Sequence, residues 1–272
     1  MPQTAVAPRQ NSVPAFAGTV EEFPGGEGPA GVVLICEHAS NAFAVDWPEL
    51  GGDLGLGANA RQAHVAWDIG ALGLSRALAA RMAPGCGGAV LVHAPLSRLV
   101  YDLNRAPDHP GVMPERSEVF DIPGNRNLTP AQRLARTRAL YLPFHETLRG
   151  EIVGLIARGR RPALIAVHSF TPVFHGTPRE VEFGVIHDDD TALTMATLAE
   201  AGGCGLVTRL NEPYSAAGEV THTIRLHATP LNLHNTMLEI RNDLIATPPD
   251  QADIAERIAP VLERALRAVG AL

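Results

Sequence analysis

The fold is decided by the stretch Gly31-Val-Val-Leu-Ile-Cys-Glu-His38, in which six small or apolar residues lead directly into two polar ones. A short, continuous apolar run of this kind is typical of a strand that is covered on both faces of a sheet. In open α/β sheets the ligand site forms beyond the carboxyl ends of the strands. The sequence therefore predicts a buried strand over residues 31–36 and a candidate functional side chain at His38.

Further apolar runs predict more strands of the same sheet. Ala89–Val92 and Ala163–Val167 are again continuous, and they lead into His93 and His168. Three more strands are predicted over residues 183–186, 205–210 and 236–241.

Helical periodicity separates these strands. Apolar residues recur at helical spacing from Arg61 to Met82, and Ala83-Pro84-Gly85 is expected to end this helix. Asp68 is predicted to lie on it.

A second long helix is predicted to begin at Thr129-Pro130, an N-cap followed by proline at the first helical position, and to run through Leu155 with a bend at Pro143. Helices are also expected over residues 190–201 and 251–268. Strands that alternate with helices predict an α/β fold whose sheet is covered on both faces.

The 272 residues are 46% hydrophobic, enough for one large core, so we expect a single domain over residues 31–272. Residues 1–30 are rich in Pro, Gly and Ala without periodicity, which predicts a loose N-terminal arm. Cys36, Cys86 and Cys204 have no paired spacing and are expected to be buried, without a disulfide or a thiolate zinc site.

The charge pattern argues against nucleic acid and membrane partners. The formal net charge is −7, and the 22 Lys and Arg residues are scattered along the chain. The sequence shows no apolar stretch of membrane-spanning length and no signal-peptide pattern, so we expect a cytoplasmic protein.

The two strand-end histidines His38 and His168 are candidates for ligands of one metal ion. A site of imidazoles and carboxylates without a thiolate cluster is typical of catalytic zinc, although manganese, iron or cobalt would also accept such ligands. The alternative for each histidine is an ordinary core or surface residue.

The segment Ser97-Arg98-Leu-Val-Tyr-Asp102-Leu-Asn104-Arg105 places two guanidinium groups and a carboxamide close together. These groups are suited to binding a carboxylate and polarising a carbonyl oxygen. The alternative is that Arg98 and Arg105 only pair with Asp102 and neighbouring acids.

Glu239 interrupts a strand whose flanking residues are apolar. Because an unpaired buried carboxylate is costly, it must have a basic partner, a metal, or a raised pKa suited to acid and base catalysis. Asp68 raises a similar question on its predicted helix, where the alternative is a cap or an ion pair. The loop over residues 211–222 contains Gly and Pro and is a candidate lid with Tyr214 and His222 as substrate contacts; the alternative is an ordinary surface loop.

Several segments together resemble the N-formylglutamate amidohydrolase family in order and spacing, over about residues 30–267. The matching segments are Cys36–Asn41, His64–Asp68, Ser97–Arg105, His168-Ser169 and Glu239–Asp243. The resemblance implies a three-layer α/β/α sandwich with a mostly parallel or mixed sheet, related to zinc carboxypeptidases and aspartoacylases.

The resemblance also implies roles for individual residues. His38 and His168 would hold zinc, Arg98, Asn104 and Arg105 would bind the substrate carboxylate and the oxyanion, and Glu239 would be the general base. Carboxypeptidases place a ligating Glu three residues after the first His, where this sequence has Asn41. Asp68 is the expected third ligand, with Glu37 and Asn41 as alternatives.

The implied reaction is hydrolysis of an acidic N-acyl amino acid, with N-formyl-L-glutamate giving formate and L-glutamate in histidine degradation. One alternative is a related zinc carboxypeptidase or deacylase that acts on another acyl amino acid. Another is a non-catalytic protein that binds an acidic metabolite. The sequence does not specify the oligomeric state.

Overall fold

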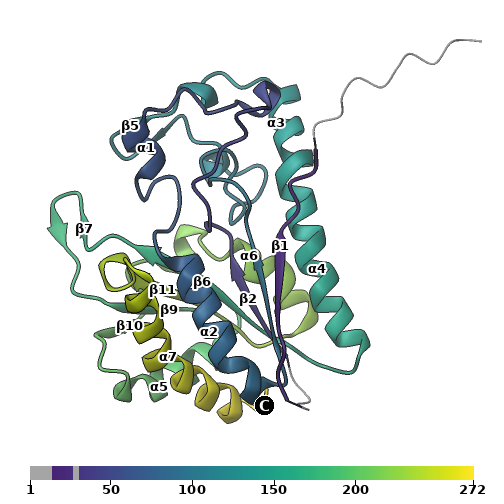
Figure 1. Ribbon diagram of the computed structural model, residues 1–272, viewed down its shortest axis with the longest axis vertical. Helices are drawn as coiled ribbons and strands as arrows, with labels where there is room; N and C mark the ends of the chain where they lie inside the picture. The colour runs from purple at the N-terminus through teal and green to yellow at the C-terminus, as the bar shows by residue number, and fades with distance from the viewer. Residues whose placement is uncertain (1–13, 27–30) are drawn as a thin grey trace, which may run out of the picture.

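Seven strands form one mixed sheet at the centre of the protein, in the order β1-β3-β2-β6-β11-β9-β10 (Figure 1). The computed structural model describes residues 14–26 and 31–272. The strands of the sheet are β1 Thr19–Phe23, β2 Val32–Cys36, β3 Ala89–His93, β6 Ala163–Phe170, β9 Phe183–Ile186, β10 Thr208–Leu210 and β11 Asn235–Arg241. Two short hairpins add β4 Arg116–Ser117, β5 Phe120–Asp121, β7 Val173–Phe174 and β8 Thr177–Pro178.

The direction of the strands decides where the candidate residues meet. The four central strands β3, β2, β6 and β11 are parallel, whereas β1 pairs antiparallel with β3 and β9 pairs antiparallel with β11. The four parallel strands therefore present their carboxyl ends at one edge of the sheet, which is where ligand sites of α/β sheets form.

Helices cover both faces of the sheet, because each strand alternates its side chains between two apolar cores. On β2, Val32, Leu34 and Cys36 pack with α2, α5 and α7, whereas Val33 and Ile35 pack with α4. The helices are α1 Ala58–Gln62, α2 Ala71–Cys86, α3 Pro130–Arg136, α4 Leu142–Ala157, α5 Ala192–Glu200, α6 His222–His227 and α7 Pro248–Ala268. The predicted α/β fold with three layers and a mixed sheet is confirmed (Figure 1).

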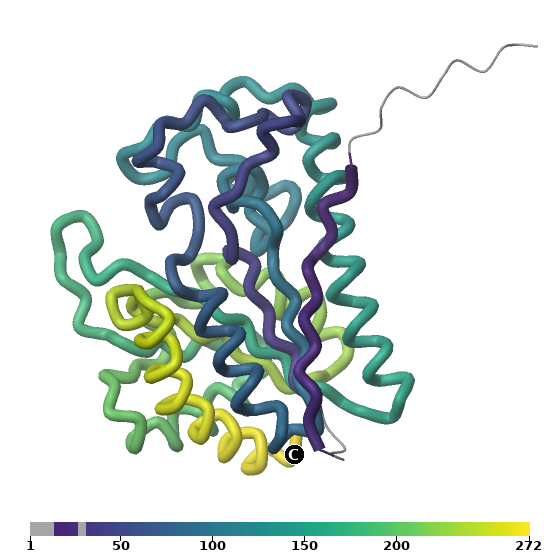
Figure 2. The backbone as a smooth tube through the Cα atoms, viewed as in Figure 1, coloured from purple at the N-terminus to yellow at the C-terminus, as the bar shows by residue number. Residues whose placement is uncertain are grey.

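The predicted N-terminal arm is wrong for residues 19–23. This stretch is β1, which pairs along its whole length with β3 and which Figure 2 shows in purple. Glu21 on β1 also pairs with His93 at an Oε1 to Nε2 distance of 3.0 Å. Pairing with a strand about 70 residues away is not visible in local composition; residues 1–13 and 27–30 of the predicted arm lie outside the described part.

The helix predicted from Arg61 to Met82 is interrupted. The structure has α1 and α2 with a turn between them, so Asp68 lies in this turn and not on a helix. Gly70 takes a φ of +82° directly before α2, a left-handed conformation that a helix does not contain. Apolar periodicity did not reveal the break because the turn residues Val65 and Ala66 are buried as well.

The predicted end of this helix at Ala83-Pro84-Gly85 is also wrong, since α2 continues to Cys86 and ends with Gly87 at a φ of +72°. A proline inside a helix leaves the carbonyl four residues earlier without its partner. Here Ala80 and Pro84 are both exposed, so water can bind that carbonyl.

The remaining local predictions agree with the structure except for the length of one strand. Thr129 is the predicted N-cap and forms a capping box with Gln132. The bend at Pro143 stays a prediction; a π-helical turn over Thr137–Tyr141 precedes this residue. All three cysteines are free and buried. Strand β10 is shorter than predicted because Gly205 takes a φ of +67° before it. No helix in the described part of the chain is long and apolar enough to cross a membrane.

We predict that Gly70→Ala destabilises the protein. A Cβ atom at this position would lie 2.2 Å from the backbone oxygen of Ile245, and the φ of +82° is unfavourable for alanine. We expect the free energy of unfolding to fall by about 1 to 3 kcal/mol in urea titrations. The control is Gly150→Ala in α4, where a Cβ atom meets nothing within 4 Å and stability should rise by about 0.5 to 1 kcal/mol. Equal stability of the Gly70 variant and the wild type would contradict the turn geometry.

Candidate active site

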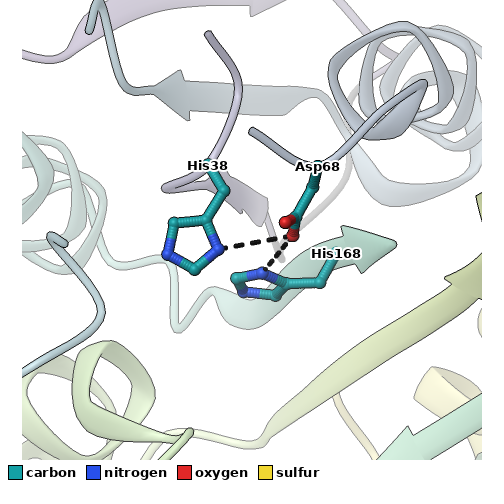
Figure 3. A group of neighbouring side chains, drawn as sticks. All are labelled: His38, Asp68 and His168. Carbon is teal, nitrogen blue, oxygen red and sulfur yellow. Dashed lines mark hydrogen bonds and ion pairs between the residues drawn. The ribbon is translucent and has the colours of Figure 1, made fainter. Parts of the chain in front are cut away.

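His38, Asp68 and His168 converge at the carboxyl edge of the parallel strands (Figure 3). Oδ2 of Asp68 lies 3.3 Å from Nδ1 of His38 and 2.8 Å from Nδ1 of His168. One potential ligand atom from each residue lies within 4.8 Å of the others, and all three side chains are buried. The three residues that we expected as metal ligands are therefore brought together.

Backbone contacts hold Asp68 in this position. Its amide donates to the carbonyl oxygen of His38 at 2.9 Å, which ties the turn before α2 to the end of β2. The amide of Ser169 donates to Oδ2 of Asp68 at 3.3 Å, and the Ser169 hydroxyl donates to the Ile69 carbonyl oxygen at 2.8 Å. The carboxylate is thus fixed from both β2 and β6.

The outer ring nitrogens of both histidines face further carboxylates. Nε2 of His38 lies 2.8 Å from Oδ1 of Asp102, and Nε2 of His168 lies 3.2 Å from Oε2 of Glu37. Asp102 also accepts from Nη2 of Arg98 at 2.9 Å and from the amide of Asn104 at 3.0 Å. A carboxylate on the outer nitrogen fixes the tautomer of a ligating histidine and directs its other nitrogen toward the metal.

The charges of this cluster fit a divalent cation. Three carboxylates, those of Glu37, Asp68 and Asp102, are buried here. Arg98 pairs with Asp68 and Asp102, and Arg105 lies 4.0 Å from Asp102. Burial lowers the pKa of both histidines, but the neighbouring carboxylates outweigh it: the pKa of His38 is raised, and that of His168 is raised well above its usual value. A site that favours an added proton on each imidazole also favours a metal cation in place of those protons.

Glu239 lies beside this cluster on the neighbouring strand. In the parallel pairing of β11 with β6 it is the partner of His168, so both side chains point to the same face of the sheet. Burial raises the pKa of Glu239 to about 7, although the charge of His168 opposes this shift. Within the described residues Oε2 of Glu239 has no hydrogen-bond partner. A buried carboxyl with such a pKa is suited to both taking and giving a proton near neutral pH.

His38, Asp68, His168 and Glu239 line a pocket of about 310 Å³. Its wall includes Arg98, Asn104, Arg105, Phe170, Thr171 and Tyr214 as well as the histidines and Glu239. The volume is at the small end of the range for small-molecule sites.

The arginine segment, residues 97–105, makes more contacts within the protein than its sequence suggested. Arg98 donates to Asp68 at 3.2 Å and to Asp102 at 2.9 Å, as in the alternative reading, and its side chain is 27% exposed. Nη1 of Arg105 donates to the carbonyl oxygens of Gly218 and Glu219. Both guanidinium groups still line the pocket.

Asn104 and Arg105 fasten the 211–222 loop. Nδ2 of Asn104 donates to the Val220 carbonyl oxygen at 2.5 Å, and its Oδ1 accepts from the Thr223 amide at 2.9 Å. The second half of the loop is therefore pinned to the arginine segment, which argues against a lid that opens over its whole length.

The two predicted contacts of this loop differ in position. Tyr214 lines the pocket, and its hydroxyl accepts from Nη2 of Arg179 at 3.3 Å. His222 does not line the pocket; its Nε2 lies 2.9 Å from the hydroxyl of Tyr141. The structure therefore does not place His222 with the other candidate residues, because at the start of α6 its side chain contacts the π-helical turn before α4.

The alternative third ligands lie elsewhere. The side chain of Asn41 donates to the carbonyl oxygen of Arg61 and to Gln62, outside the pocket. Glu37 faces the outer nitrogen of His168, whereas Asp68 faces the inner one. Asp102 is the residue to which sequence analysis assigned no role at the histidines. Its position four residues after Arg98 was the available signal, because that spacing suits an ion pair.

Comparison with known proteins shows to which family the chain belongs. The sequence model of the N-formylglutamate amidohydrolase family matches residues 30–246. The chain belongs to this family. It is therefore an amidohydrolase, and the resemblance noted in the sequence is confirmed. No curated protein matches the sequence.

Two crystal structures are similar to this N-formylglutamate amidohydrolase family member. A gene product from Agrobacterium tumefaciens is 45% identical, with a TM-score of 0.84, and the alignment covers 92% of this chain and 96% of that one. N-formylglutamate amidohydrolase from Ralstonia eutropha JMP134 is 18% identical, with a TM-score of 0.63, and the alignment covers 93% of this chain and 99% of that one. The second structure shows a shared fold.

We predict that Asn104→Ala loosens the 211–222 loop. The substitution removes both hydrogen bonds that Asn104 makes with Val220 and Thr223. Each is worth roughly 1 kcal/mol, so amide hydrogen exchange in the loop should accelerate by about tenfold or more. In the control Asn41→Ala, which loses contacts elsewhere on the surface, exchange of this loop should be unchanged. Equal protection in wild type and Asn104→Ala would show that Asn104 does not hold the loop.

Proposed function

We propose that the protein hydrolyses the amide bond of an acidic N-acyl amino acid with the help of a bound zinc ion, and that N-formyl-L-glutamate is its substrate. The observation that carries this proposal is the buried His38-Asp68-His168 group beside Glu239 in one pocket. Membership in the N-formylglutamate amidohydrolase family supports the same reaction. The products are formate and L-glutamate. Histidine degradation and the cytoplasm remain part of this proposal, on the sequence alone.

His38, Asp68 and His168 would hold the metal. Two imidazoles and one carboxylate leave a coordination position open, which is the usual arrangement of catalytic zinc; manganese, iron or cobalt would accept the same ligands. When bound, the ion polarises the scissile carbonyl and lowers the pKa of the attacking water.

Glu239 acts as the general base and then as the general acid. Its carboxylate takes a proton from the attacking water, and the same proton is then given to the nitrogen of the leaving amino acid. A pKa of about 7 in the buried state suits both steps. The free oxygen Oε2 has no competing partner among the described residues, so it remains available to the reacting water.

The basic side chains of the pocket act on the substrate. Arg98 lies against Asp68 and Asp102, so its charge is largely balanced, and its part in the reaction is to polarise the carbonyl oxygen. Arg105 has a weaker ion pair, 4.0 Å from Asp102, and is the better candidate to bind a substrate carboxylate. Asn104 and Tyr214 complete this side of the pocket.

We predict that the purified wild type contains near-stoichiometric zinc and releases formate from N-formyl-L-glutamate, and that His168→Ala abolishes both. The variant loses one imidazole ligand and its link to Asp68. The measurements are elemental analysis and a formate assay. His234→Ala is the matched control, because this half-exposed histidine pairs with Asp190 outside the pocket.

A wild type that stays metal-free after zinc is supplied, and that is inert, would contradict the mechanism. It would favour the alternative of a non-catalytic protein that binds an acidic metabolite. Zinc without formate release would favour the other alternative, a deacylase or carboxypeptidase acting on a different acyl amino acid, and a panel of acyl amino acids would identify its substrate.

We predict that Glu239→Gln keeps the metal and loses most of the activity. An amide is similar in size but cannot take a proton, so kcat should fall by about 10² to 10⁴ fold while the zinc content stays unchanged. The control is Glu146→Gln on the exposed surface of α4, which should behave like the wild type. Retention of full kcat in Glu239→Gln would rule out its role as the base.

A further inference from the structure

Glu37 is a fully buried carboxylate that pairs with a single basic side chain. Its exposed fraction is 0%, and within the described part of the chain its ion pair is with His168. Asp102 at the other histidine differs, because it also accepts from Arg98 and from the amide of Asn104. Burying an ionised carboxylate is costly unless a partner compensates for it.

The partner of Glu37 is His168. Oε2 of Glu37 lies 3.2 Å from Nε2 of His168, whose Nδ1 faces Asp68 at 2.8 Å. The Glu37 carboxylate is therefore directed at the outer edge of this one imidazole.

We propose that Glu37 is a positioning residue of the metal centre, which accepts the Nε2 proton of His168 and thereby presents the Nδ1 lone pair to the metal. The inference rests on the metal centre of the proposed function. A neutral imidazole carries one proton, so fixing it on Nε2 frees Nδ1 for coordination. A carboxylate beside the outer nitrogen Nε2 also makes the inner nitrogen Nδ1 a stronger ligand.

Two other roles for Glu37 fit the structure less well. As a ligand it would have to reach the space between His38 and Asp68, but it lies at Nε2, on the outer side of the His168 ring. As a structural residue it would be expected to hold backbone donors, and no backbone amide in the described residues donates to it. Its removal therefore disturbs the centre without breaking a backbone hydrogen bond.

The test compares the zinc affinity of the wild type, Glu37→Ala and Glu37→Gln by competition with a chromophoric chelator. We expect Glu37→Ala to bind zinc about 10 to 100 fold more weakly, the usual effect of losing such a partner. Glu37→Gln should lie between this variant and the wild type, because its amide oxygen can still accept the Nε2 proton but carries no charge. The control is Asp188→Asn, a buried carboxylate that pairs with Arg225 and does not line the pocket; its zinc affinity should be unchanged.

A second readout follows the geometry of the centre. The visible absorption of the Co²⁺-loaded protein reports on the ligands, and we expect its bands to shift in Glu37→Ala and to remain as in wild type in Asp188→Asn. Thermal unfolding of each metal-free variant checks that it is folded. Should Glu37→Ala fail to fold, Glu37→Gln alone decides the comparison.

Wild-type zinc affinity in the folded Glu37 variants would overturn the inference. A wild type that binds no divalent metal would overturn it together with the proposed metal centre. A wild type that binds zinc but does not hydrolyse N-formyl-L-glutamate would contradict only the proposed substrate. Weaker zinc binding in the Glu37 variants would still support the role of Glu37, because chelator competition does not depend on turnover.

Discussion

The site depends on one interaction, the carboxylate of Asp68 held between the imidazoles of His38 and His168. Its Oδ2 atom joins the end of β2, strand β6 and the turn before α2, which are far apart in the sequence. Gly70 makes this turn possible because it takes a left-handed conformation directly before the helix. Without the turn, Asp68 would be carried on a continuous helix and its position would be set by the helix axis.

Buried negative charge is the second constraint on the site. The carboxylates of Glu37, Asp68 and Asp102 surround two imidazoles, and Arg98 and Arg105 pair with Asp102. Buried carboxylates are costly unless positive charge compensates for them. The pKa values of both histidines are raised, so protonated imidazoles can provide this positive charge. A bound divalent metal ion would provide it instead. Glu239 lies close enough to be desolvated with the cluster but has no partner of its own in the described residues, which gives it a pKa suited to proton transfer.

The wall of the pocket is preorganised by contacts between two segments that sequence analysis treated separately. Asn104 and Arg105 bind the backbone of the loop over residues 218–220, so the arginine segment and the loop position each other. These polar groups thus stabilise the pocket as well as lining it. The charge of Arg98 is largely balanced by its ion pairs with Asp68 and Asp102, which the sequence did not show. The contacts of Asn104 and Arg105 with the loop cannot be read from the sequence, because these partners lie more than 100 residues away along the chain.

The sequence by itself determined the α/β class, the strand over residues 32–36 and the N-cap at Thr129, because these follow from local periodicity and residue chemistry. It also singled out His38, Asp68, His168 and Glu239, whose roles are implied by the resemblance to the family. The tertiary structure alone decided that residues 19–23 form an edge strand and that Asp68 lies in a turn. It also decided the side-chain partners: His222 contacts Tyr141, and Asp102 and Glu37 contact the outer ring nitrogens of the two histidines. Local patterns report which face of an element is buried. They do not report which distant side chain meets a given nitrogen, since that is set by strand order and register.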